Sequence, residues 1–427
     1  MERTYISDVL KEKGGHGKVL VKGWVHDTRD LGKLCFLLLR DMSGIIQVTA
    51  HRDKTEKKYF ELMKKVNRES VLSVEGKIEK NKKAPGGVEI LPEKIEIIAE
   101  ANSPLPIDVS DFSKTELPKR LDYRFLDLHR KKTQAIFKIQ SEIANAFREH
   151  FYKKGFIEMQ PPSIISSSSE GGTELFPVKY FEQNAYLAQS PQLYKQMLAC
   201  SIEKVFTITP VWRAEKHNTI RHLNESRQMD IEMAFANQME VMKELEEVVK
   251  YIVEQVIKKC SHELEILEIK LKVPKAVYLS YEEAIKKVNG KVGDDFSPEQ
   301  EKKLCEKYPD SIVFTHSWPS KIKPFYIMPK GEKADAKLSE GFDTLYNGME
   351  ISSGGQRIHI PALLTERLKA KKLNPKNFQS YIDSFRYGAP VHSGWSVGLE
   401  RFTMALLNLD NIREACLFPR DRERLTP

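Results

Sequence analysis

The strongest constraint on the fold of this chain is a change of sequence pattern near residue 100. Before that point, short apolar runs, some alternating with polar residues, are separated by turn residues, which is typical of β-strands. Pro104 and Pro106 then mark a linker, because proline cannot complete a sheet ladder. Beyond them, apolar residues recur at helical spacing, which predicts long helices over residues 138–152 and about 240–259. The pattern therefore predicts a small β domain followed by a larger mixed domain.

The order of elements in the first hundred residues favours one kind of barrel. Five strands are expected, with a helix between the third and the fourth: residues 18–26, 35–39, 44–50, 56–66 (the helix), 71–78 and 88–98. This is the order of an OB-fold, a small barrel that binds oligonucleotides on one face. A different small β-barrel would give a similar pattern and remains the alternative.

Charge and cysteine usage narrow the class of protein. The chain has 68 Lys+Arg against 60 Asp+Glu, a net charge of +8, and half of this excess lies in the first hundred residues. Such an excess is compatible with a nucleic-acid partner, although ordinary surface variation explains it equally well. The five cysteines are scattered without a CxxC pair, so neither a disulfide framework nor a zinc ribbon is expected. With no apolar run long enough to span a membrane, a cytoplasmic location is predicted.

Three segments of the second domain carry groups suited to a nucleotide. Arg213 and Arg221 flank a polar loop between two expected strands. A guanidinium group can bind two phosphate oxygens at once. Glu350 and Ser353 offer the hard oxygen ligands that Mg²⁺ prefers. Further on, a glycine-rich strand leads into a helix that begins near Leu399 and carries Arg401 in its first turn. Singly these are a solvated hairpin, a surface carboxylate and an ordinary turn; in this order they favour a phosphate site.

These segments resemble the three motifs of the class II aminoacyl-tRNA synthetases. Residues 155–162 are similar to motif 1, residues 213–222 to motif 2 and residues 394–401 to motif 3. The expected OB-fold, together with further segments, resembles subclass IIb, which contains the aspartyl, asparaginyl and lysyl enzymes. Within that subclass the resemblance is to the archaeal-type aspartyl-tRNA synthetases, and it covers the chain except a variable stretch near 260–320. It rests on residues 36–41, 120–127, 170–176, 190–195, 354–359 and 417–427.

The resemblance implies an α+β fold and a reaction. An OB-fold anticodon-binding domain is expected over residues 1–104, a hinge over 105–130, and a class II catalytic domain over 131–427, with an antiparallel sheet flanked by helices. The implied activity is ATP-dependent attachment of L-aspartate to tRNA(Asp) through an aspartyl-adenylate. ATP and Mg²⁺ are the implied cofactors, and a homodimer is implied because motif 1 forms a dimer interface in this class. No membrane partner is expected, since the chain has no long apolar run.

The resemblance also assigns roles to individual residues. Arg213 and Arg401 are the expected catalytic residues, and Glu350 and Ser353 the expected metal ligands. The expected aspartate-binding residues are Glu170, Gln192, Lys195, Arg213, Ser353 and Arg357. The expected ATP-binding residues are Arg213, Ala214, Glu215, Arg221, His222, Leu223, Glu350, Gly398, Leu399, Glu400 and Arg401.

The amino-acid assignment depends on charge. A buried carboxylate substrate requires compensating cations, and Lys195 and Arg357 are expected to supply them. The asparaginyl family typically lacks the lysine, so Lys195 favours aspartate. Ser393 and Ser396 stand where motif 3 usually has glycine, and their hydroxyl groups either crowd the floor of the site or add a hydrogen bond.

The barrel is expected to bind the anticodon. By resemblance, Phe36 stacks on an unpaired base, with a core phenylalanine as the alternative, while Gln47 and Glu89 contact base edges. His26 and Pro85 look like the pair found in relatives that charge both tRNA(Asp) and tRNA(Asn), which would require a downstream amidotransferase. The alternatives are a strictly discriminating enzyme, an asparaginyl-tRNA synthetase and a non-catalytic RNA-binding relative.

Overall fold

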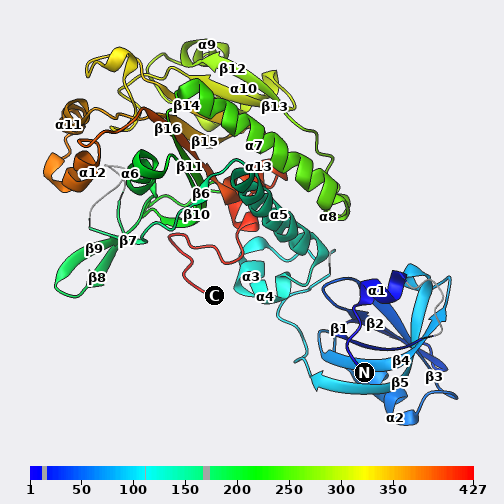
Figure 1. The fold of residues 1–427 in the computed structure, drawn as a ribbon. Helices are drawn as coiled ribbons and strands as arrows, with labels where there is room; N and C mark the ends of the chain where they lie inside the picture. Colours follow the sequence, from blue (N-terminus) through cyan, green and yellow to red (C-terminus); the bar gives the residue numbers. More distant parts are fainter. Residues whose placement is uncertain (12–16, 111, 167–173) are drawn as a thin grey trace. The chain divides into compact units, whose positions relative to one another are not determined.

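The chain divides into two units after Pro106. The computed structural model describes residues 1–11, 17–110, 112–166 and 174–427, and its units are Met1–Pro106 and Ile107–Pro427. Figure 1 shows the first unit in blue and the second in colours from cyan to red. No helix of the described residues is both long and apolar enough to cross a membrane.

The first unit is a closed five-stranded barrel in the order β1-β2-β3-β5-β4. Its core forms because apolar residues alternate along the strands: Cys35, Leu37 and Leu39 are fully buried, whereas the residues between them are half-buried. The OB-fold prediction is confirmed. The elements are α1 (Ile6–Lys11), β1 (Lys18–Asp30), β2 (Leu34–Arg40), β3 (Ile45–His51), α2 (Lys57–Lys65), β4 (Val71–Lys80) and β5 (Val88–Ala99).

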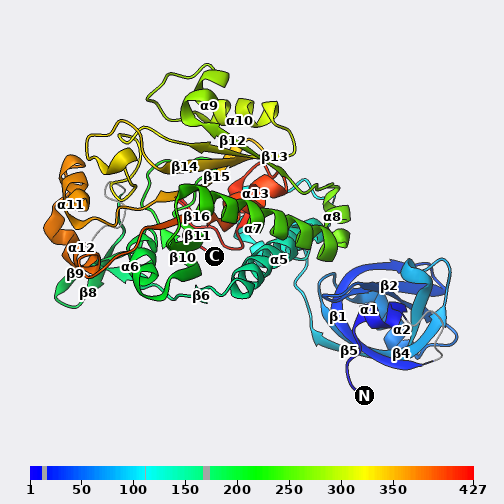
Figure 2. The same ribbon diagram turned by 45° about the horizontal axis from the view of Figure 1, so that its top comes forward.

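The second unit is built on an eight-stranded sheet, visible edge-on in Figure 2. Its strands follow the order β12-β13-β14-β15-β16-β11-β10-β6. The central pairs are antiparallel as expected, but β12 pairs with β13 and β6 with β10 in parallel, so the sheet is mixed. The parallel pairs arise because helical segments return the chain between those strands. The bounds are β6 (Ile157–Glu158), β10 (Lys204–Trp212), β11 (Glu225–Ala234), β12 (Lys275–Ser280), β13 (Ser311–His316), β14 (Gly341–Tyr346), β15 (Met349–Gln356) and β16 (His392–Gly398).

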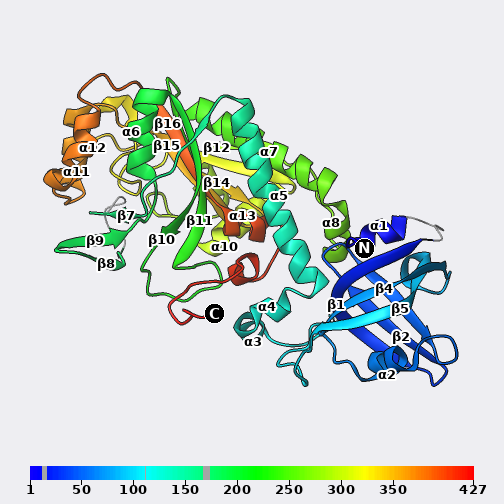
Figure 3. The ribbon, with the colours of Figure 1, turned by 60° about the horizontal axis from the view of Figure 1, so that its bottom comes forward.

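Two long helices, α5 (Lys131–Lys153) and α7 (Gln238–Lys259), cover one face of this sheet and share its main apolar core (Figure 3). Both were expected, but α5 begins earlier than the predicted residue 138, because Thr133, Ala135 and Ile136 are already buried. Gly155 then ends the helix with a φ of 76°. The remaining helices are α3 (Leu117–Asp122), α4 (Arg124–Asp127), α6 (Gln192–Ile202), α8 (Ser261–Leu267), α9 (Tyr281–Lys287), α10 (Pro298–Lys307), α11 (Pro361–Ala370), α12 (Gln379–Ser384) and α13 (Leu399–Leu406).

A small second sheet of order β7-β9-β8 lies outside the eight-stranded sheet (Figure 1). Its strands are β7 (Ile164–Ile165), β8 (Pro177–Tyr180) and β9 (Gln183–Leu187).

The segment expected to be a hinge contains α3 and α4. Arg124 in α4 is fully buried, pairs with Asp127 at 2.6 Å, and donates to the carbonyl of Cys416 at 2.9 Å. These contacts tie part of the segment to the C-terminal residues of the second unit. A hinge function over 105–130 stays a prediction.

Candidate active site

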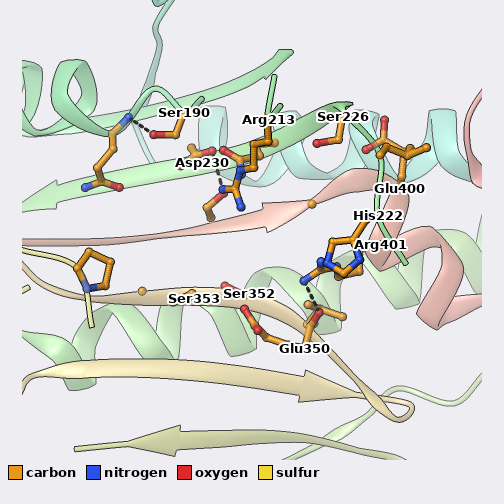
Figure 4. A pocket seen from close by; sticks show the side chains of 18 of the residues that line it. Ser190, Arg213, His222, Ser226, Asp230, Glu350, Ser352, Ser353, Glu400 and Arg401 are labelled. Atoms are coloured by element: carbon orange, nitrogen blue, oxygen red, sulfur yellow. Dashed lines mark hydrogen bonds between the residues drawn. The ribbon is translucent and has the colours of Figure 1, made fainter. Parts of the chain in front are cut away.

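A cavity of about 340 Å³ opens on the second unit, on the side of the sheet away from α5 and α7. Strand periodicity determines this side: Met229 and Ile231 of β11 point into the core, whereas Gln228 and Asp230 line the cavity. Figure 4 shows the groups that meet there, which come from β11, β15, α13 and the loop before β11.

Most of the predicted active-site residues line this one cavity. They are Gln192, Arg213, Glu215, Arg221, His222, Leu223, Glu350, Ser353, Arg357, Gly398, Glu400 and Arg401. Lys195, Ala214 and Leu399 are not among its lining residues, and Glu170 lies outside the described residues. The segments similar to motifs 2 and 3, which are far apart in the sequence, therefore meet at one site.

Arg401 and His222 lie together at the cavity. Arg401, in the first turn of α13, donates from Nη1 to the Glu350 carbonyl at 3.4 Å, and His222 lies beside it (Figure 4). Burial lowers the pKa of His222, and the positive charge of Arg401 lowers it further. The imidazole is therefore neutral near pH 7. It can present a ring face or an unprotonated nitrogen to a nucleotide without adding a charge.

Two buried ion pairs form the floor of the site. Lys195 Nζ lies 2.6 Å from Asp230 Oδ1, and it also donates to the Trp395 carbonyl at 3.0 Å. Arg357 donates to both oxygens of Glu232, at 2.9 and 3.2 Å. All of these side chains are at most 2% exposed. The floor is therefore neutral overall.

These pairs correct the expected electrostatics. The sequence predicted Lys195 and Arg357 as cations facing the substrate, but each already has a carboxylate partner, and Lys195 does not reach the cavity surface. Burial raises the pKa of Asp230, and the nearby Lys195 opposes this rise. Arg357 does line the cavity, and its two bonds to Glu232 use Nε and Nη2. These bonds fix the guanidinium group, which also lies 5.6 Å from the centre of the Tyr326 ring.

Asp230 and Glu232 belong to the floor of the site, and the sequence reasoning did not assign them to it. They lie two positions apart on the central strand β11 and so share the face of the cavity. Carboxylates at that spacing in the second half of a strand, where Met229, Ile231, Met233 and Ala234 are apolar, were the available signal. Glu232 also explains a glycine of motif 3, since a Cβ on Gly394 would lie 2.1 Å from Glu232 Oε2.

The predicted metal ligands lie on β15. Burial raises the pKa of Glu350 to about 7, and the neighbouring negative charge of Asp343 adds to this effect. Asp343 faces Ser353 across the β14–β15 pair and contacts Lys323. Among the described residues, its buried Oδ1 has no hydrogen-bond partner. Crowded carboxylates with an unsatisfied oxygen form a donor set that fits a hard divalent cation, and Asp343 joins Glu350 and Ser353 as a candidate ligand.

The first unit brings three of its predicted residues, Phe36, Gln47 and Glu89, together on the outer face of the barrel. Gln47 on β3 donates to Glu89 Oε2 on β5 at 2.8 Å, and Thr49 and Asn81 donate to the same oxygen. Phe36 is half-buried on the outer face of β2, opposite Thr49 across the β2–β3 pair, and is not part of the barrel core.

His26 and Pro85 occupy separate positions in the barrel. His26 Nδ1 lies 3.2 Å from Arg40 Nη1, and Pro85 is exposed in the turn that precedes β5. A role for either residue in anticodon choice stays a prediction.

Comparison with known families and proteins agrees with the geometry. A family described as tRNA synthetases class II (D, K and N) matches residues 116–422, and one described as an OB-fold nucleic acid binding domain matches residues 19–98. The chain belongs to the class II tRNA synthetases. The resemblance drawn from its motifs is thus confirmed.

Individual relatives carry two related names. An Aspartate--tRNA(Asp/Asn) ligase of Archaeoglobus fulgidus and an Aspartate--tRNA(Asp) ligase of Pyrococcus horikoshii are each 47% identical, with all of both chains covered. Among solved structures, an asparaginyl-tRNA synthetase from Pyrococcus horikoshii complexed with asparaginyl-adenylate is similar at a TM-score of 0.95 and 36% identity, again over all of both chains.

Proposed function

We propose that this class II synthetase is an aspartate–tRNA ligase that activates L-aspartate with ATP and transfers it to tRNA(Asp) and tRNA(Asn). The proposal is supported by one observation above others. One cavity is lined by four arginines and a carboxylate: Arg213, Arg221, Arg357, Arg401 and Glu350. Such a cavity can hold an amino acid and a nucleoside triphosphate side by side.

In the first step, the α-carboxylate of aspartate attacks the α-phosphorus of ATP and pyrophosphate leaves. No side-chain nucleophile is required, because positioning and neutralisation of the developing negative charge provide the catalysis. Arg213 holds the α-phosphate, while Arg221 and Arg401 hold the outer phosphates. Gln192, at the start of α6, binds the ammonium end of the amino acid.

The two ion pairs of the floor select the side chain of the amino acid. Arg357 offers its Nη1 donors to the substrate carboxylate while Glu232 keeps the guanidinium in place. Lys195, which is paired with Asp230, contributes its positive charge from below the cavity surface. Since a carboxylate gains more than an amide from these charged donors, the floor favours aspartate over asparagine.

Glu350 and Ser353, with Asp343 as an additional ligand, would hold Mg²⁺ at the phosphates. When bound, Mg²⁺ would neutralise phosphate charge. The residues of the chain fix where the amino acid and the α-phosphate meet.

In the second step, a hydroxyl of the 3′-terminal adenosine of the tRNA attacks the aspartyl carbonyl, and AMP leaves. The barrel face at Phe36, Gln47 and Glu89 binds the anticodon. His26 and Pro85 support acceptance of tRNA(Asn), whose aspartylated product an amidotransferase would then convert. A homodimer and a cytoplasmic location complete the proposal.

Pyrophosphate exchange tests the activation step. Purified enzyme should exchange pyrophosphate into ATP with aspartate and far less with asparagine. Arg213→Ala and Arg401→Ala should each reduce exchange by at least about a hundredfold, because each removes a charge aimed at the transition state. Arg386→Ala, at an exposed arginine, is the matched control. Asparagine-dependent exchange would replace the proposal with the asparaginyl alternative.

Charging of purified tRNAs tests the choice of anticodon. Aspartate should be attached to both tRNA(Asp) and tRNA(Asn). Charging of tRNA(Asp) alone would leave a strictly discriminating aspartate–tRNA ligase, and absence of charging despite normal exchange would point to a defect at the barrel.

A further inference from the structure

Glu301 contacts Arg221, which lines the cavity, but does not line the cavity itself. It belongs to α10 (Pro298–Lys307), within the stretch near 260–320 that the motif resemblance does not cover. Its Oε2 lies 3.0 Å from Arg221 Nη1, and the side chains of Glu301 and Arg221 are 14% and 25% exposed. The ion pair is therefore shielded from water at the wall of the cavity.

The same carboxylate contacts the strand that carries the candidate metal ligands. The backbone N–H of Glu350 donates to Glu301 Oε2 at 3.4 Å. On the other side of that residue, the Glu350 carbonyl accepts from Arg401 at 3.4 Å. Arg221 and Arg401 are thus anchored on the backbone of one residue, Arg401 directly and Arg221 through Glu301.

Arg221 needs such an anchor because of where it lies. It belongs to the long loop between β10 and β11, and its side chain also donates from Nη2 to the Gly348 carbonyl at 3.3 Å. An arginine on a loop has many rotamers, and ordering it in advance lowers the entropy lost when a ligand binds. The bonds to Glu301 and Gly348 leave Nε and further Nη hydrogens available to phosphate oxygens.

We infer that Glu301 is a positioning residue for ATP: it holds Arg221 at the cavity wall, in register with Arg401 and Glu350, so that both arginines meet the outer phosphates. The inference rests on the proposed function. It assigns no contact between Glu301 and ATP itself. Its effect is therefore expected on ATP and not on aspartate.

Kinetics of pyrophosphate exchange test this assignment. Glu301→Ala should raise the KM for ATP by about fivefold or more, with the KM for aspartate changed less than about twofold. Glu301→Gln keeps an acceptor for Arg221 and should fall between Glu301→Ala and the wild type. Glu306→Ala, at an exposed residue of the same helix, is the matched control. A lower KM for ATP in Glu301→Ala would mean that Glu301 withholds Arg221 instead, which would overturn the inference.

A double-mutant cycle separates positioning from a general structural role. If Glu301 acts through Arg221, adding Glu301→Ala to Arg221→Ala should raise the KM for ATP no further. Effects that multiply, or an equal rise in both KM values, would overturn the inference. Thermal unfolding of Glu301→Gln shows whether the fold is intact, and this isosteric variant carries the test if Glu301→Ala is unstable. Failure of the proposed function would appear differently, as absence of aspartate-dependent exchange in the wild type and in Glu306→Ala.

Discussion

Ser396 shows at the scale of one residue how a departure from the family pattern fits the site. It lies in β16 between Asp230 of β11 and Ser353 of β15, each its direct neighbour across the sheet. Its hydroxyl donates to Asp230 Oδ2 at 3.0 Å. Of the alternatives that the sequence left open, the structure favours the added hydrogen bond. Asp230, Ser396 and Ser353 thus lie side by side on three strands. They connect the buried ion pair of Lys195 and Asp230 with the candidate metal ligand Ser353.

Removal of this hydroxyl should destabilise the protein. In Ser396→Ala, Oδ2 of the buried Asp230 loses a donor, so the free energy of unfolding should fall by about 1–3 kcal/mol. Ser396→Gly should cost a further 0.5–1 kcal/mol or so, because glycine adds backbone freedom to the unfolded chain. Denaturant unfolding of the three proteins measures both steps. A Ser396→Ala variant as stable as the wild type would show that the bond contributes nothing.

Glu400 gives the protein a pH-dependent stability. Its side chain is 4% exposed in α13, accepts from the Arg227 N–H at 2.9 Å, and has its pKa raised by burial from 4.5 to about 7. Between these pH values the folded state binds more protons than the unfolded state. The contribution of Glu400 to stability is therefore greatest below pH 4.5 and declines until about pH 7.

The variant Glu400→Gln isolates this effect. The stability of the wild type relative to Glu400→Gln should fall by about 3 kcal/mol at most from pH 4.5 to 7, since each pKa unit corresponds to about 1.4 kcal/mol. Urea unfolding of both proteins across that range measures the difference. A difference that stays constant, or that grows with pH, would contradict the assigned pKa.

At the scale of elements, α7 shows why local pattern predicts a helix well. The sequence predicted residues 240–259, and the helix runs from Gln238 because Asn237 caps it. The Asn237 side chain accepts from the N–H groups of Met239 and Glu240, and the Glu240 side chain accepts from the Asn237 N–H at 2.8 Å. This reciprocal capping box satisfies backbone donors that the first turn cannot pair.

Loss of this cap should weaken the long helix. Asn237→Ala is expected to lower the free energy of unfolding by about 1 kcal/mol, within a usual range of about 0.5–2 kcal/mol. Glu254→Ala, at an exposed position of the same helix, should change it by less than about 0.5 kcal/mol. Thermal or denaturant unfolding compares the variants. Equal effects at both positions would mean that the cap does not contribute.

Contacts between distant elements were not predictable from the sequence. Strands such as β4 (Val71–Lys80) follow from alternation along a few residues, and the predicted range 71–78 is close to the observed one. Arg221 and Glu301, by contrast, are 80 positions apart, and Lys195 and Asp230 are 35 apart. Family motifs identified the phosphate-binding arginines but not their carboxylate partners, because partners depend on how the elements pack. The buried ion pairs of the floor and the contact between Glu301 of α10 and Arg221 are therefore visible only in the folded structure.

At the scale of the whole molecule, the two units divide recognition by chemistry. The second unit carries the charged cavity, where arginines and carboxylates suit phosphates and an amino acid. The first carries a face where the ring of Phe36 lies near the hydrogen-bonded pair of Gln47 and Glu89. If the proposed function is correct, amino-acid activation is expected to need only the second unit, which carries the cavity, and charging of tRNA to need both. A substitution in the barrel should therefore separate the two steps.

Phe36→Ala is the substitution that tests this division. Loss of a stacked base is worth about 1–3 kcal/mol, so kcat/KM for tRNA should fall by about 5- to 150-fold. Aspartate-dependent pyrophosphate exchange should not change, because it requires no tRNA. Leu31→Ala, at an exposed apolar residue in the turn between β1 and β2, is the matched control and should leave both activities intact. Unchanged charging by Phe36→Ala would place anticodon binding elsewhere on the barrel, and a parallel loss of exchange would show that the two steps cannot be separated in this way.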